Sequence, residues 1–193
     1  MNKPTALLLI VLLSPLLGGM YGILHDQITY TISHEYYTKF KFIQFGIESW
    51  GMGVNIGTPE APEIELQHPR VGVAIVGFLA TWWVGLFIGC ILGPVGLIHR
   101  DGGRMFRITM KAVLITVGVA LSFGLAGLLY GSLVSADLPH RFLPDNLANR
   151  TSFIMVGSMH NFSYLGGVIG MMVGLVYSIR QRKGDGGGEG EMG

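Results

Sequence analysis

The sequence of 193 residues carries little charge and almost no cysteine. Charged side chains make up 13% of the residues, against about 25% in soluble domains. The formal net charge of +1 provides no general attraction for nucleic acid or for an acidic substrate, so we expect no nucleic-acid partner. Cys90 is the single cysteine, which excludes an internal disulfide and any metal site built from several cysteines.

Recognised catalytic motifs are missing as well. The chain has no G-x-S-x-G, H-E-x-x-H or P-loop sequence, and no dinucleotide-binding glycine motif placed between a strand and a helix. These absences favour a non-enzymatic protein.

Long apolar runs dominate the rest of the sequence. Half of the residues are hydrophobic, and four runs are long enough to cross a bilayer, which takes roughly 20 residues. The predicted spans are residues 5–24, 71–93, 112–134 and 152–179. The sequence therefore predicts an all-α membrane protein, a four-transmembrane-helix bundle formed by one domain over residues 1–183. The glycine-rich acidic tail, residues 184–193, is predicted to be disordered.

Basic residues orient the predicted bundle. They crowd the link between the second and third spans and follow the fourth span: Arg100, Arg104, Arg107, Lys111, Arg180, Arg182 and Lys183. Because cytoplasmic segments are rich in lysine and arginine, both termini are predicted to be cytoplasmic and residues 25–70 extracytoplasmic. A cleaved signal peptide is the alternative for the first span. We favour a retained helix, because no A-x-A-like cleavage site follows it.

The first extracytoplasmic segment is predicted to hold an amphipathic helix. Its β-branched residues 28–32 favour an extended conformation first. After Ser33, a plausible helix cap, apolar residues recur at helical spacing, and Glu35 and Lys39 form an i,i+4 pair. Such a helix suits the outer membrane surface. Residues 51–70, rich in glycine and proline, are predicted to form a surface loop.

This segment also resembles a known pattern. His25-Asp-Gln-Ile-Thr-Tyr-Thr-Ile-Ser-His-Glu-Tyr-Tyr is similar to H-D-x-[IV]-[ST]-x-x-[IV]-S-x-E-Y-[FY], found after the first membrane helix of uncharacterised small bacterial integral membrane proteins. The resemblance implies a multi-pass protein of the bacterial inner membrane and supplies no activity. Those proteins often have proline where this chain has His34, a residue suited to the first helical position after a serine cap, which argues against a ligand role for His34.

Glycines spaced four residues apart occur in every span. The longest series lie in the second and fourth spans: Gly85, Gly89 and Gly93, and Gly166, Gly170 and Gly174. Small residues at this spacing let helix backbones approach closely in lipid. The pattern predicts a tight bundle or a homo-oligomer, and it specifies packing rather than chemistry.

His160 is the strongest functional candidate, because an ionisable side chain inside a membrane helix is costly. It lies about eight residues into the fourth span, roughly 12 Å below the outer end. Asp26, just after the predicted first span, would meet the negative end of the helix dipole and needs a partner. We expect His25, Asp26 and His160, with Glu35, to form a metal or proton site near the outer leaflet. In the alternative, Asp26 pairs with Lys39 or Lys41 and His160 makes a structural hydrogen bond.

The sequence thus predicts a non-enzymatic membrane protein with a site for a transition-metal ion or a proton. A small oligomeric transporter or channel is the alternative, and a membrane enzyme or haem-binding subunit is the third choice. The expected partners are the lipid bilayer and another copy or a membrane protein.

Overall fold

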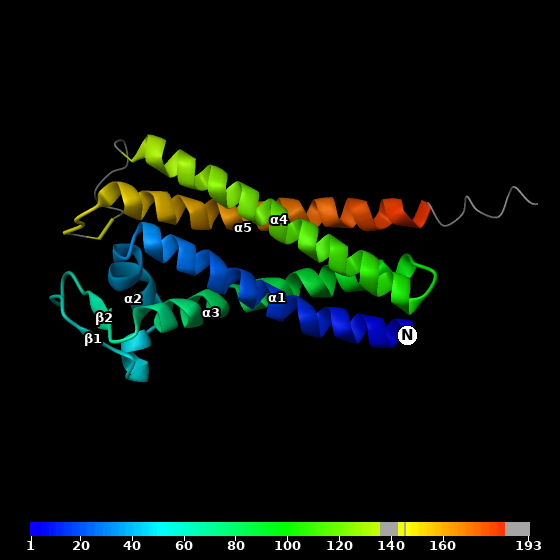
Figure 1. Cartoon of the computed structure of the whole chain (residues 1–193), viewed down its shortest axis with the longest axis horizontal. Coiled ribbons are helices and arrows are strands. Elements are labelled where there is room, and N and C mark those ends of the chain that lie inside the picture. The colour runs from blue at the N-terminus through cyan, green and yellow to red at the C-terminus, as the bar shows by residue number, and fades with distance from the viewer. Residues whose placement is uncertain (136–142, 145, 184–193) are drawn as a thin grey trace, which may run out of the picture.

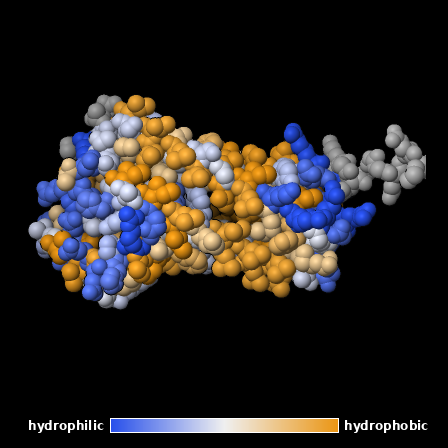
Figure 2. Space-filling model, in the orientation of Figure 1, coloured by the Kyte–Doolittle hydropathy of each residue, from blue (hydrophilic) through white to orange (hydrophobic). Residues whose placement is uncertain are grey.

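Four long helices make up most of the computed structural model, which describes residues 1–135, 143–144 and 146–183. They are α1 (Lys3–Ile32), α3 (Pro69–Val95), α4 (Gly102–Val134) and α5 (Arg150–Lys183). All four are long and apolar enough to cross a membrane. Figure 2 shows an apolar band around the middle of the molecule and hydrophilic residues at both ends. The four-helix prediction is confirmed, whereas the predicted tail disorder concerns residues outside those described.

The long helices pack as two pairs, α1 with α3 and α4 with α5, and the two pairs touch each other less extensively (Figure 1). Within each pair, glycines lie where the backbones come closest. A Cβ atom on Gly18 would lie 2.9 Å from the Cα of Gly85, and one on Gly170 would lie 2.8 Å from the Cα of Thr116. The looser boundary between the pairs is where the site described below is found.

Helix α1 is longer than the sequence indicates, since it continues from the predicted end at Leu24 to Ile32. The prediction of an extended segment over residues 28–32 is therefore wrong. Asp26 lies inside the helix, so its expected position beyond the C terminus is also wrong. Contacts with α3 stabilise the extra turns, because the Arg70 guanidinium donates to the Gln27 carbonyl at 2.8 Å. Such tertiary contacts override β propensity.

Helix α4 begins ten residues before its predicted start. Asp101 caps it by accepting a hydrogen bond from the Arg104 N–H at 3.0 Å, and this capping residue sets the helix boundary. Arg104, Arg107 and Lys111 therefore lie on the helix rather than in a loop. Pro94 stands one residue before the end of α3, as its missing backbone donor predicts.

The segment between α1 and α3 covers one end of the bundle (Figure 1). It contains a π-helical turn (Tyr37–Lys41), α2 (Phe42–Gln44), a 3₁₀ turn (Ile47–Trp50) and an antiparallel pair of strands, β1 (Gly53–Asn55) and β2 (Ile64–Leu66). The sequence predicted one regular helix followed by a loop. The broken helix buries Tyr37, Phe42 and Ile47 against α3 and α5 in one core, and this burial outweighs regular helix geometry. Whether the segment lies on a membrane surface stays a prediction.

A candidate metal centre between the helix pairs

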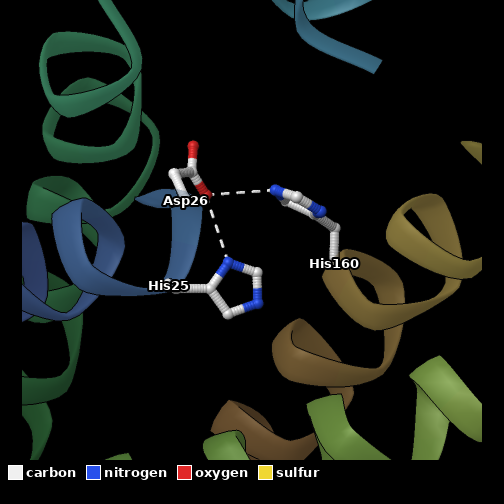
Figure 3. Close-up of side chains that lie close together, drawn as sticks. All are labelled: His25, Asp26 and His160. Atoms are coloured by element: carbon white, nitrogen blue, oxygen red, sulfur yellow. Dashed lines mark hydrogen bonds and ion pairs between the residues drawn. The ribbon is translucent and has the colours of Figure 1, made fainter. Parts of the chain in front are cut away.

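His25, Asp26 and His160 meet inside the bundle, where α1 faces α5 (Figure 3). Oδ1 of Asp26 lies 3.1 Å from Nδ1 of His25 and 3.1 Å from Nε2 of His160. One possible ligand atom from each residue lies within 4.8 Å of the other two. All three side chains are buried, with 4%, 2% and 6% exposure. The sequence predicted the contact between Asp26 and His160 from the depth of His160 in the fourth span and from the need of Asp26 for a partner.

The segment after α1 closes this group from one side. Tyr36 stacks on the His160 ring with 5.0 Å between centroids. Its neighbour Tyr37 donates a hydrogen bond to the backbone carbonyl of Asp26 at 3.2 Å. The broken helix therefore shields the polar group from solvent. This explains why His25 and Asp26 are buried, although the sequence placed both in the extracytoplasmic segment.

Both histidines use their second ring nitrogen to bind a neighbouring group. Nδ1 of His160 lies 2.9 Å from the Val156 carbonyl. A carbonyl can only accept, so Nδ1 carries the proton. Nε2 of a neutral His160 then presents a lone pair to Asp26, and two lone pairs repel unless a proton or a cation lies between them. His25 completes the arrangement, because its Nε2 lies 3.2 Å from the Ser163 hydroxyl.

Asp26 has a second carboxylate oxygen, Oδ2, that is buried. Within the described part of the chain, no group hydrogen-bonds to it. A carboxylate oxygen without a partner is costly in an apolar environment. The carboxylate therefore retains capacity to bind a further donor or a cation.

Lysines do not satisfy Asp26 in the way that the sequence alternative required. Lys39 pairs with Glu35 at 3.0 Å. Lys41 is buried, with its ammonium 5.6 Å from the centre of the Phe45 ring. Burial lowers the pKa of Lys41, although the negative charge of Asp26 opposes this effect. Lys41 thus adds positive potential near Asp26, and the direct partners of the carboxylate are the two histidines.

Glu35, the fourth expected ligand, lies outside this group. Its carboxylate accepts hydrogen bonds from the backbone N–H groups of Ala148 and Asn149 at 2.9 and 2.8 Å. The predicted Glu35–Lys39 ion pair is confirmed. Burial alone would raise the pKa of Glu35, but the two N–H donors and Lys39 hold it below its usual value. The role of Glu35 is to bind the chain just before α5.

A cavity of about 510 Å³ extends from the histidine group between the two helix pairs. Its polar end contains Tyr21, His25, Asp26, His160 and Ser163. Most of the remaining wall is apolar and comes from α3, α4 and α5, for example Ala80, Val84, Ile88, Val113, Val117 and Met171, whereas α1 contributes Ser14 and Gly18. The hydroxyl groups of Ser14, Thr81 and Thr116 in this part of the wall donate to backbone carbonyls. Sequence reasoning missed Tyr21, whose hydroxyl donates to Ser163 at 3.3 Å. Its position four residues before His25, on the same helix face, was the available signal.

Comparisons with protein-family models, with curated proteins and with solved structures found no match. Two imidazoles and one carboxylate suit zinc and other first-row transition metals. Three protein ligands leave a fourth tetrahedral position free.

Proposed function

We propose that this integral membrane protein binds one divalent transition-metal ion through His25, Asp26 and His160. The observation that carries the proposal is the hydrogen bond from Nδ1 of His160 to the Val156 carbonyl. It orients the Nε2 lone pair toward Asp26, and metal-binding histidines are commonly held this way by a second partner. A cation between Nε2 and the carboxylate removes the lone-pair repulsion.

The distances support such an ion. Metal–ligand bonds of about 2.1 Å in a tetrahedral site put neighbouring ligand atoms roughly 3.4 Å apart. Oδ1 of Asp26 lies 3.1 Å from each histidine nitrogen. The three ligand atoms lie within 4.8 Å of one another, so binding requires the histidine rings to turn toward a common centre, and the unpartnered Oδ2 can serve as a ligand or as a second acceptor.

The proposed setting is the outer half of the bacterial inner membrane. His25 and Asp26 lie in the last two turns of α1, under Tyr36 and Tyr37 of the segment that also carries α2, β1 and β2. Basic residues on α4 and α5 favour a cytoplasmic location for the other end of the bundle. We propose a non-enzymatic role, with the bilayer as partner. Assembly with another copy or with a membrane protein remains part of the proposal.

Elemental analysis tests the metal site. Protein purified in detergent and exposed to Zn²⁺, then freed of excess metal, should retain about one ion per chain. Asp26→Asn and His160→Ala should each weaken retention by roughly tenfold or more. His34→Ala is the matched control, because His34 is exposed and lies outside the group. Equal metal content in all four proteins, or none in the wild type, would contradict the proposal.

Transport is less well supported than binding. The imidazole and carboxylate groups gather at one end of the cavity, and the hydroxyl groups of Ser14, Thr81 and Thr116 in the rest of its wall are bonded to backbone carbonyls. Within the described residues, one subunit therefore offers no continuous polar path. A metal-binding protein should leave Zn²⁺ flux into liposomes at the level of empty vesicles. Flux that depends on His160 would favour the transporter alternative.

A further inference from the structure

We propose that the cavity binds a single-chain amphiphile with a carboxylate head group, such as a long-chain fatty acid. The chain lies along the apolar wall, and the carboxylate takes the free position of the metal. This inference rests on the proposed metal site, whose ligand class it names.

The shape of the cavity supports an elongated ligand. Its wall follows α1 from His25 to Ser14 and α5 from His160 to Met171. The two ends of each stretch are eleven positions apart, which is roughly 16 Å of helix. The imidazole and carboxylate groups lie at one end of this length, and the hydroxyl groups of Ser14, Thr81 and Thr116 along the rest are bonded to backbone carbonyls. A volume of about 510 Å³ falls in the range of cavities that enclose small molecules, about 300–1,000 Å³. A polar head with one extended apolar chain matches this distribution.

The exposed part of the wall indicates how such a ligand enters. Trp83 and Phe87 on α3 and Tyr164 and Val168 on α5 line the cavity, yet they are 53%, 58%, 41% and 51% exposed. These residues belong to helices with membrane-spanning character, so the exposed surface faces lipid rather than water. The cavity is thus open sideways to the bilayer between α3 and α5, which favours a ligand dissolved in the membrane.

Charge selects the head group. A divalent ion bound by one carboxylate and two neutral imidazoles has a net charge of +1. An uncompensated charge is costly at low dielectric. A fourth ligand with one negative charge makes the centre neutral. A fatty acid provides that charge, whereas a fatty amine of the same length would add a second positive charge.

Tryptophan fluorescence tests occupancy. Trp83 lines the cavity, and its neighbour Trp82 does not. A chain with Trp83 as its only tryptophan (Trp50→Phe and Trp82→Phe) should show saturable quenching by a brominated long-chain fatty acid in the presence of Zn²⁺. An unbrominated fatty acid should reverse it. The matched chain with Trp82 as its only tryptophan should show quenching that rises with the concentration of the brominated fatty acid without reaching saturation. Equal quenching of both chains, without saturation in either, would overturn the inference.

Two glycines provide a matched pair of blocking variants. A Cβ atom on Gly167 or on Gly118 would meet nothing within 4 Å, but only Gly167 lines the cavity. Gly167→Leu should weaken fatty-acid binding roughly tenfold, since it displaces about two methylene groups of the chain. Gly118→Leu should leave binding unchanged. Retained metal content shows that each variant is folded. If Gly167→Leu does not fold, the comparison of the Trp83 and Trp82 chains tests the occupancy of the cavity without it. Equal binding by both folded variants would overturn the inference.

The head group is tested on the same proteins. The fatty acid should bind about tenfold more tightly with Zn²⁺ than with a chelator, because the chelator removes the ion that its carboxylate binds, and a fatty amine should not compete with it. Competition by the amine, or no effect of Zn²⁺, would overturn the inference. Metal-loaded protein that binds no fatty acid also overturns it and leaves the metal site standing. Protein without metal overturns both proposals, and elemental analysis identifies that case.

Discussion

His160 shows how one side chain can define a site when both of its ring nitrogens are engaged. Nδ1 is committed to the Val156 carbonyl, 2.9 Å away on the same helix. Nε2 is therefore the only nitrogen that can reach Asp26 across the boundary between α5 and α1. The tautomer of a buried histidine shows whether each ring nitrogen donates or accepts. In His160 the protonated Nδ1 leaves a lone pair on Nε2, so a proton or a cation must lie between Nε2 and Asp26.

Glu35 has a structural role, and pH reveals it. Its pKa is lowered in the folded protein, so the charged carboxylate stabilises the fold above its unfolded pKa of about 4.3, and this contribution is lost as the pH falls through the folded pKa. Glu35→Gln should lower stability at pH 7 by about 1 kcal/mol, because it removes charge from hydrogen bonds to two backbone N–H groups.

Melting temperatures in detergent across pH measure this effect. The difference between the wild type and Glu35→Gln should shrink below pH 4. Glu65→Gln is the control, because Glu65 lies exposed on β2. An equal loss from both variants, or a difference that persists in acid, would rule out a charged role for Glu35.

The sequence predicted part of the site because ionisable side chains in or beside a membrane span are energetically costly without a partner. His25, Asp26 and His160 are ionisable groups in or beside apolar runs, where each needs a partner, and the structure brings the three together. Glu35 could not be assigned in the same way. Its partners are backbone N–H groups more than a hundred positions away, and backbone groups leave no mark in an amino-acid sequence.

At the scale of helices, hydropathy located the spans but not their ends. Helix α1 continues for eight residues beyond the end of the apolar run at Leu24. Its last, polar turns are held by contacts with Tyr37 and Arg70. Helix α4 extends into the basic region because Asp101 caps it. The length of an apolar run predicts which part of a helix can span the bilayer, whereas caps and tertiary contacts determine where the helix begins and ends.

Close helix contacts yield a second test. A Cβ atom on Gly89 would lie 2.7 Å from Cβ of Ser14 in α1, and one on Gly170 would lie 2.8 Å from the Thr116 backbone in α4. Gly89→Leu and Gly170→Leu should each destabilise the protein by about 1–3 kcal/mol through overpacking. Gly118→Leu, which meets open space, is the control.

Thermal unfolding and size in detergent provide the measurements. We expect a lower melting temperature for both contact variants and no change for the control. If Gly89→Leu and Gly170→Leu melt like the control with the same oligomer size, small-residue spacing does not direct this packing.

The whole molecule is two helix pairs joined by a polar centre. Each pair has its own close contacts, so the boundary between the pairs can hold both a cavity and a site to which each pair contributes. His25 and Asp26 come from the first pair and His160 from the second. Ligand binding at the centre would therefore couple the pairs.

Orientation in the membrane is the prediction that belongs to the whole molecule. The first residues of α1 and the end of α5 lie at the same end of the bundle (Figure 1). Basic residues gather at that end, including Arg104, Arg107 and Arg182, and the segment with β1 and β2 lies at the other. Because segments rich in lysine and arginine stay in the cytoplasm, a reporter enzyme that works only in the cytoplasm should be active when it is fused after Lys183. A reporter enzyme that works only outside the cytoplasm should be active when it is inserted in residues 57–61. The reverse pattern would place the metal centre in the inner half of the membrane, where a carboxylate ligand would have to enter from the cytoplasmic leaflet.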